Sequence, residues 1–140
     1  MQREKLLMTP GPTMIPHRVR ETMARQIIHH RTKEFEHYFE KMNEGLKKVF
    51  QTQNPVLTLV SSGTCGMEAA VVNSFSPDDK VLVASTGVFG DRFVKIASRF
   101  GLDVKVISVP WGHGVDPKEI EDFLNGPDGK DVKGVLVTHN

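Results

Sequence analysis

The chain has 140 residues, of which 39% are hydrophobic and 25% are charged, and its 18 basic and 17 acidic residues leave a net charge of +1. This length and composition are typical of a globular protein with one buried core, and the balanced charge gives no electrostatic reason to expect nucleic acid or a membrane as a partner. A single cysteine, Cys65, cannot form an internal disulfide, and the N-terminal apolar run is too short for a signal peptide. We therefore expect a cytoplasmic protein.

The N-terminal part of the chain divides into an arm and a helical segment. The arm, residues 1–16, holds three of the eight prolines, a density that disfavours a regular helix and predicts an extended backbone. Residues 17–52 carry two helical patterns. The first begins after Pro16, and the second has Thr32 as its N-cap and runs through Phe50 with an apolar stripe along one face.

From residue 53 onward, short apolar runs alternate with helical segments, which predicts an α/β fold with a mostly parallel sheet and flanking helices. The predicted strands are Val56–Val60, Lys80–Ser85, Asp103–Val109 and Lys133–Asn140. The predicted helices are Gly66–Phe75, a helix near Asp91–Phe100 with Phe100 among its inward residues, and a helix with Asp116 as N-cap and Pro117 as first residue. Because no helix follows the last strand, we expect residues 53–140 to be the first part of a larger domain, truncated before its end.

The segment SSGTCG (Ser61–Gly66) follows the first predicted strand and leads into a helix. Ligands of open α/β sheets bind beyond the carboxyl ends of the strands, and helix N-termini favour anions. Gly63 and Gly66 would let the backbone approach such an anion closely. Neither the G-x-G-x-x-G pattern of a dinucleotide site nor the lysine of a nucleotide P-loop is present. Two interpretations stay open, a site for an isolated phosphate and a tight turn without a ligand.

The next predicted strand is followed by TGVFGDRF, in which Phe89 lies between Gly87 and Gly90. The spacing allows Phe89 to be a core residue at the start of the next helix. On spacing alone the core role is favoured, whereas beside a phosphate site the ring could instead stack on a planar heterocycle. The pattern alone does not decide between these two roles.

The histidines of HHRTKEF do not predict a metal site. His29 and His30 are adjacent, and neither has a histidine partner one helical turn away with a carboxylate nearby, so zinc is not expected. We expect these side chains at the junction between two helices, hydrogen-bonded to the backbone. Cys65 is expected to pack in its turn as a small apolar residue.

Five segments together resemble the amino-terminal part of the class V aminotransferases, the group of alanine–glyoxylate and serine–pyruvate aminotransferases. They are TPGPT (Thr9–Thr13), HHRTKEF (His29–Phe35), SSGTCGMEAAVVN (Ser61–Asn73), TGVFGDRF (Thr86–Phe93) and VTHN (Val137–Asn140), and they span essentially the whole chain. The resemblance implies pyridoxal 5'-phosphate (PLP) as cofactor, part of the large domain of a fold-type I PLP enzyme, and a homodimer. It also implies transfer of an amino group from alanine, serine or aspartate to a 2-oxo acid such as glyoxylate or pyruvate.

The resemblance also implies roles for individual residues. Ser62, Gly63 and Thr64 match the loop that holds the cofactor phosphate, Phe89 matches the aromatic residue stacked on the pyridine ring, and Gly11 matches the segment on the substrate side of the pocket. The Schiff-base lysine, the acidic partner of the pyridine nitrogen and the arginine for the substrate carboxylate have no counterpart in the chain. We therefore expect no catalytic residue here and no transamination by these 140 residues alone. A cysteine desulfurase or lyase of the same fold, and a non-catalytic phosphate-binding scaffold, remain as alternatives.

Overall fold

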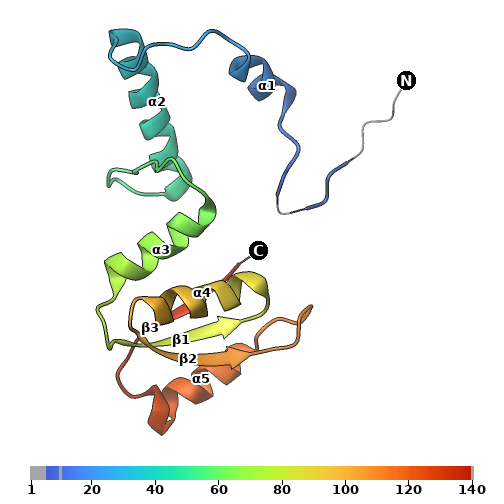
Figure 1. Ribbon diagram of the computed structural model, residues 1–140, viewed down its shortest axis with the longest axis vertical. Helices are drawn as coiled ribbons and strands as arrows, with labels where there is room; N and C mark the ends of the chain where they lie inside the picture. The colour runs from blue at the N-terminus through green and yellow to red at the C-terminus, as the bar shows by residue number, and fades with distance from the viewer. Residues whose placement is uncertain (1–5, 10, 140) are drawn as a thin grey trace. The chain divides into compact units, whose positions relative to one another are not determined.

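The computed structural model describes residues 6–9 and 11–139, and the chain forms two compact units, residues 1–59 and 60–140 (Figure 1). The first unit contains helices α1 (His17–Met23) and α2 (Lys33–Phe50), separated and flanked by irregular segments. Both helices begin where the sequence predicts. The finer division of the chain at residues 16 and 52 stays a prediction.

Helix α2 has a defined cap at each of its two ends. The Thr32 hydroxyl accepts a hydrogen bond from the backbone N–H of Phe35 at 3.3 Å and donates one to the His29 carbonyl at 2.8 Å. The helix ends at Gln51, whose φ of 51° is left-handed. The predicted apolar stripe is present, but within this fully described helix no residue is buried, and Val49 is 75% exposed.

The second unit is an α/β unit. Its elements are α3 (Gly63–Ser74), β1 (Lys80–Ser85), α4 (Val88–Arg99), β2 (Asp103–Ser108), α5 (Pro117–Asn125), the short 3₁₀ helix η1 (Pro127–Gly129) and β3 (Val132–Val137). The three strands form a parallel sheet in the order β2-β1-β3. The predicted fold class, an α/β arrangement with a parallel sheet, is confirmed.

Strand β1 is the centre of this sheet. Every residue from Val81 to Ser85 is buried, whereas β2 and β3 alternate between more and less exposed positions. The chain runs from β1 to β2 on one side and then crosses back to β3 on the other side. Connections between parallel strands are almost always right-handed. Because the β1–α4–β2 and β2–α5–β3 connections run in opposite directions across the sheet, their helices should lie on opposite faces, and Figure 1 shows α4 and α5 there.

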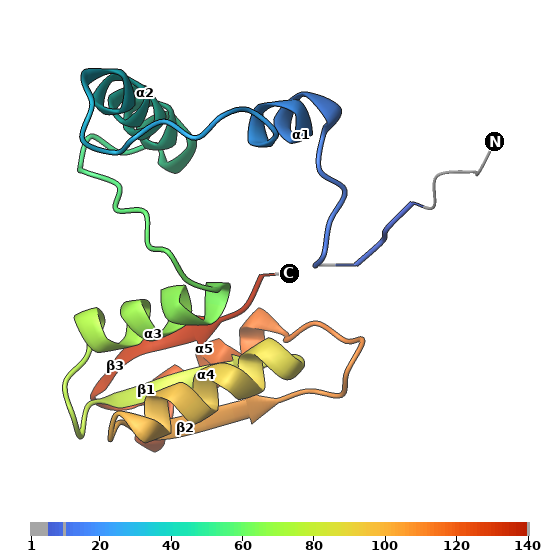
Figure 2. The ribbon, with the colours of Figure 1, turned by 45° about the horizontal axis from the view of Figure 1, so that its top comes forward.

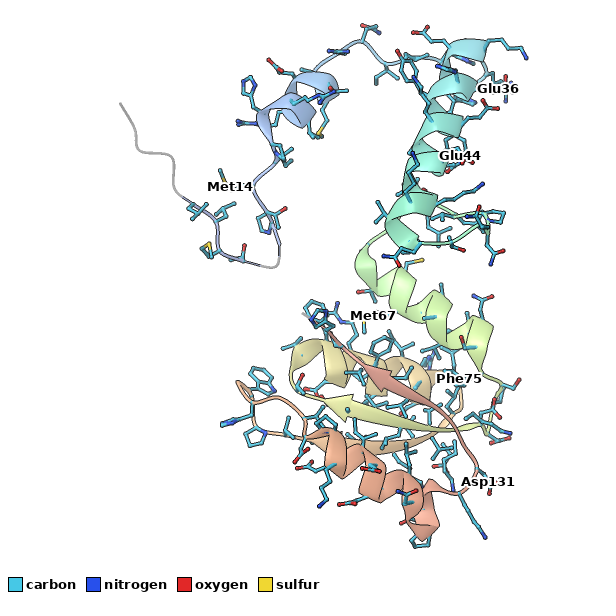
Figure 3. The ribbon with its side chains drawn as sticks, turned by 180° about the vertical axis from the view of Figure 1, so that it is seen from behind. Met14, Glu36, Glu44, Met67, Phe75 and Asp131 are labelled. Carbon is cyan, nitrogen blue, oxygen red and sulfur yellow. The ribbon has the colours of Figure 1, made fainter. Side chains whose placement is uncertain are left out.

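The core lies between the sheet and the helices α3 and α4, which lie side by side in Figure 2. Its buried residues are Val71, Val81, Ala97 and Leu102, and the partly buried residues packed against them include Phe75, Phe93 and Ile96. Phe75, at the end of α3, is labelled in Figure 3. The inward position predicted for Phe100 is wrong, because α4 ends at Arg99 and Phe100 lies past its last turn, 38% exposed.

One predicted strand is wrong. The residues Val56–Val60 are all described, and none of them belongs to a strand; Leu57, for example, is 83% exposed. A strand needs a neighbour for its backbone hydrogen bonds, and the described sheet consists of β2, β1 and β3, none of which pairs with these residues. The glycine turn therefore follows an irregular segment, and α3 begins at Gly63, three residues earlier than predicted.

The remaining boundaries are close to the predictions. Asp116 caps α5, its carboxylate accepting from the N–H of Lys118 at 2.9 Å, and Pro117 is the first helical residue. Strand β3 ends at Val137; Asn140, in the predicted strand, and Pro10, in the predicted PGP turn, lie outside the described residues. Within the described ranges, no helix has the length and apolar character needed to cross a membrane.

Candidate functional site

The N-terminus of α3 is formed by the residues predicted to hold a phosphate. Ser62 is the N-cap, with an extended backbone (φ −89°, ψ 167°), and its side chain makes no capping hydrogen bond among the described residues. The Cys65 N–H donates to the Ser62 carbonyl at 3.0 Å. The N–H groups of Gly63 and Thr64 belong to the first turn, where no earlier helical carbonyl is available to accept them. This end of α3 therefore offers two backbone donors and a hydroxyl.

The space at this helix end is open. A Cβ built on Gly63 would meet no described atom within 4 Å, and Ser62 and Gly63 are both exposed. The first-turn N–H groups and the positive partial charge of the helix N-terminus together favour an anion in such a place. The local geometry therefore fits the phosphate interpretation of the glycine turn.

Phe89 lies near the N-terminus of α4, as the second residue of that helix. Its side chain is 38% exposed, and it lies outside the buried core cluster. The interpretation of Phe89 as a core residue is therefore wrong. An aromatic ring that remains accessible can stack on a flat ligand, which is the other role that its spacing allowed.

Arg92 joins these two parts of the site. Its guanidinium Nη1 donates a hydrogen bond to Thr64 Oγ1 at 2.8 Å, and its Cζ lies 5.2 Å from the centroid of the Phe89 ring. The hydrogen bond spans 28 residues of sequence and connects α3 with α4. Thr64 and Arg92 are both half-buried, and within the described part of the chain no ion pair involves Arg92. The site therefore includes a cation that no described carboxylate neutralises.

A second set of contacts fixes the turn between β1 and α4. Ser85 is buried at the carboxyl end of β1, and its hydroxyl lies 2.6 Å from Asp91 Oδ1 and 3.3 Å from the Gly87 carbonyl. Gly90 packs directly against Ser85, since a Cβ at Gly90 would lie 2.7 Å from the Ser85 Cα. These contacts determine where α4 starts and hence where Phe89 and Arg92 lie.

The other candidate residues belong to the first unit. Gly11 is exposed, and the Thr9 hydroxyl donates a hydrogen bond to the Pro12 carbonyl at 2.8 Å. His29 Nδ1 accepts from the Arg31 N–H at 3.0 Å, and the rings of His29 and His30 are stacked. The expectation of histidines hydrogen-bonded to the backbone between two helices is thus confirmed for His29.

A pocket of about 1010 Å³ in the first unit includes His29 among its lining residues, together with Met23, Phe35 and Tyr38. No described set of three or more His, Cys, Asp or Glu side chains is placed to hold a metal ion.

Sequence reasoning did not assign roles to Arg92, Ser85 or Asp91. The signal available for Arg92 was its spacing of three from Phe89, which places both on neighbouring positions of a helix surface. Its contact with Thr64 depends on the packing of α3 beside α4, which no local pattern shows. Ser85 ends a predicted strand, and its hydroxyl gave no separate signal.

Comparison with known proteins identifies the family. The model of the family "Aminotransferase class-V" matches residues 6–140. Over the whole chain, 41% of residues are identical to "Soluble hydrogenase, small subunit" of Synechococcus sp. and 39% to "L-aspartate--glyoxylate aminotransferase" of Paracoccus denitrificans, and the chain covers 36% of each of these proteins. The structure of ureidoglycine–glyoxylate aminotransferase from Bacillus subtilis superimposes with a TM-score of 0.81 and 28% identity, over 94% of this chain and 34% of that one. The chain spans about a third of the length of these relatives, and it belongs to the class V aminotransferase family.

Proposed function

We propose that this chain supplies the phosphate-binding and ring-stacking part of a PLP site in an aminotransferase. The observation that carries the proposal is the pairing of an open helix N-terminus at Ser62–Thr64 with the accessible ring of Phe89, linked through Arg92. The class V family implies PLP, a ligand with one phosphate and one flat heterocycle. An isolated phosphate would occupy the helix N-terminus at Ser62–Thr64 and would leave the ring of Phe89 without a role.

The residues present fit the cofactor. The N–H groups of Gly63 and Thr64 and the hydroxyls of Ser62 and Thr64 would donate to phosphate oxygens, with the positive end of α3 behind them. The ring of Phe89 would lie against the pyridine ring. Bound PLP supplies the electron sink for bond breaking at the amino acid Cα. In this proposal the side chains of this chain bind and orient, and none of them transfers a proton.

For the whole protein, we propose the transfer of an amino group from alanine, serine or aspartate to glyoxylate or pyruvate. The proposal is supported by family membership and by relatives named for aspartate–glyoxylate and serine–glyoxylate transfer. Since the chain spans about a third of such relatives, we propose that the cofactor-binding lysine and the substrate arginine lie in sequence outside these 140 residues, as the family resemblance implies.

We further propose that the whole protein is a homodimer in a reducing compartment, the cytoplasm. The apolar side chains exposed along α2, among them Phe39 and Val49, support a protein partner for this helix. The single cysteine supports the compartment. The proposed substrate-side role of Gly11 rests on the family resemblance alone.

The experiment for the activity uses the full-length protein that carries this chain. The purified protein is incubated with PLP, glyoxylate and one of alanine, serine or aspartate, and glycine formation is followed by chromatography. The proposal expects glycine with at least one donor and none when the donor is omitted. The proposal would be contradicted if no glycine forms from glyoxylate with any of the three donors and if, with pyruvate as the acceptor, no alanine forms from serine or aspartate.

A second candidate is a role in a hydrogenase assembly, which the name of the Synechococcus relative favours. This candidate would be favoured if hydrogen reduces a redox dye only when the protein is present and if the protein transfers no amino group. Release of sulfide from cysteine, or of ammonia from a single amino acid without an acceptor, would instead favour a desulfurase or a lyase.

A further inference from the structure

Arg92 occupies a position that neither the family resemblance nor the sequence pattern assigned. It lies on α4, one turn after Phe89, and contacts a residue of the phosphate turn on α3. Its guanidinium donates to Thr64 and lies against the ring of Phe89, and in the proposed function these two residues hold opposite ends of the same ligand. A single side chain therefore contacts both the turn Ser62–Thr64 and the ring of Phe89.

The hydrogen bond to Thr64 has a direction. A guanidinium only donates, so in the 2.8 Å contact the Thr64 hydroxyl is the acceptor. Its own proton is then left for another acceptor. The helix N-terminus beside it favours an anion, which accepts hydrogen bonds and cannot donate them when fully ionised. The contact with Arg92 thus prepares the Thr64 hydroxyl to donate to a phosphate.

The guanidinium of Arg92 also lies against the ring of Phe89. The guanidinium carbon lies 5.2 Å from the ring centroid, within the range of a cation–π interaction. Phe89 is at the exposed end of α4, where an aromatic side chain otherwise has freedom to turn. A planar cation against the ring limits that freedom. Lysine carries the same charge but lacks the planar fork that can contact a hydroxyl and a ring together.

We propose that Arg92 is a positioning residue of the PLP site, which orients the Thr64 hydroxyl toward the cofactor phosphate and holds the Phe89 ring in place to stack on the pyridine ring. The inference rests on the proposed cofactor function and adds a residue to it. Arg92 acts through Thr64 and Phe89, so its effect depends on their presence.

The test compares Arg92→Gln, Arg92→Lys, Thr64→Val and the Arg92→Gln/Thr64→Val double variant of the 140-residue chain. Lys95→Gln is the matched control, because Lys95 is exposed on the same helix, three residues further on. Dissociation constants for PLP are measured by titration, and folding of each variant is checked by circular dichroism. In the ligand-free proteins, NMR records the Thr64 side-chain rotamer and the Phe89 ring shifts.

The proposal expects Arg92→Gln to weaken PLP binding about tenfold, Arg92→Lys to weaken it several-fold, and Lys95→Gln to leave it unchanged. In the Thr64→Val background, Arg92→Gln should cost at most about threefold, because part of its effect passes through the missing hydroxyl. A tenfold loss in both backgrounds, or wild-type affinity of Arg92→Lys, would overturn the positioning role, since charge alone would then explain the effect.

The ligand-free NMR separates this inference from the proposed function. If the wild-type chain binds no PLP, the proposed function fails, and the spectra still decide whether Arg92 orients the side chains of Thr64 and Phe89. A change of the Thr64 rotamer and of the Phe89 ring shifts in Arg92→Gln, but not in Lys95→Gln, supports it. Unchanged Thr64 and Phe89 signals in Arg92→Gln overturn it, whatever the affinities are.

Discussion

Gly90 allows α4 to pack against the end of β1, and replacing it with alanine tests this contact. The new Cβ would lie 2.6 Å from the Ser85 Oγ and 2.7 Å from the Ser85 Cα. The hydroxyl can rotate away, at the cost of its 2.6 Å hydrogen bond to Asp91. The Cα cannot, because Ser85 is buried at the end of the central strand, paired with Ser108 of β2.

The size of the effect follows from these contacts. Overpacking of this kind costs about 1 to 3 kcal/mol, and loss of a hydrogen bond to a charged group costs about 1.5 to 3 kcal/mol. Alanine recovers about 1 kcal/mol through its higher helix propensity. The net prediction is a loss of about 1.5 to 5 kcal/mol in the free energy of unfolding of the second unit.

Amide hydrogen exchange of Leu82 and Val83 in β1 measures this loss, because both residues are buried in the central strand. Gly90→Ala should accelerate their exchange at least about tenfold. Gly66→Ala is the matched control, since Gly66 lies in α3 with no described atom within 4 Å of the new Cβ, and it should stabilise by up to about 1 kcal/mol. Equal exchange rates in the two variants would refute the packing argument.

Four further predictions address other elements. Thr32→Ala should destabilise the N-terminal turn of α2 by about 1 kcal/mol and accelerate exchange of the Phe35 amide, whereas Thr32→Ser should not. Gln51→Gly should stabilise α2 by about 1 kcal/mol, because glycine adopts the left-handed conformation of this position without strain. The gain is measured as helical circular dichroism that persists to higher urea concentration. Gly134→Ala should destabilise the second unit by about 1 to 3 kcal/mol, since its Cβ would lie 2.6 Å from the Phe75 ring, and Phe75→Leu in the same chain should recover part of that loss. The 140-residue chain incubated with PLP, aspartate and glyoxylate should form no more glycine than the same mixture without protein. More glycine than in that control would refute the proposal that the catalytic groups lie in sequence outside these 140 residues.

The elements predictable from the sequence are those determined by local chemistry. Thr32 and Asp116 cap their helices as predicted, because a side-chain oxygen beside free N–H groups is a short-range effect. Strand β1 was predictable because a strand buried on both faces is continuously apolar. The turn Ser61–Gly66 was recognisable as a candidate anion site because the first N–H groups of a helix lack helical acceptors, and small glycine and hydroxyl residues leave them accessible.

The features that could not be predicted depend on contacts between distant residues. The segment Val56–Val60 has the composition of a strand, but strand formation requires a partner strand, and none of the three described strands pairs with it. The exposure of Phe89 depends on where α4 starts, which Ser85 and Gly90 determine. The Arg92–Thr64 hydrogen bond depends on the packing of α3 against α4. Periodicity describes one element at a time and contains no information about these contacts.

PLP binding by the turn Ser62–Thr64 together with the ring of Phe89 is the proposal on which the others depend. It is tested most directly by titrating the isotope-labelled chain with PLP, with pyridoxal lacking the phosphate, and with inorganic phosphate, while the backbone amide shifts are recorded. PLP should shift the amides of Gly63, Thr64 and Phe89 and should bind more tightly than either partial ligand, because only PLP would occupy both halves of the site. Absence of shifts at these three residues, or equal affinity for PLP and inorganic phosphate, would contradict it.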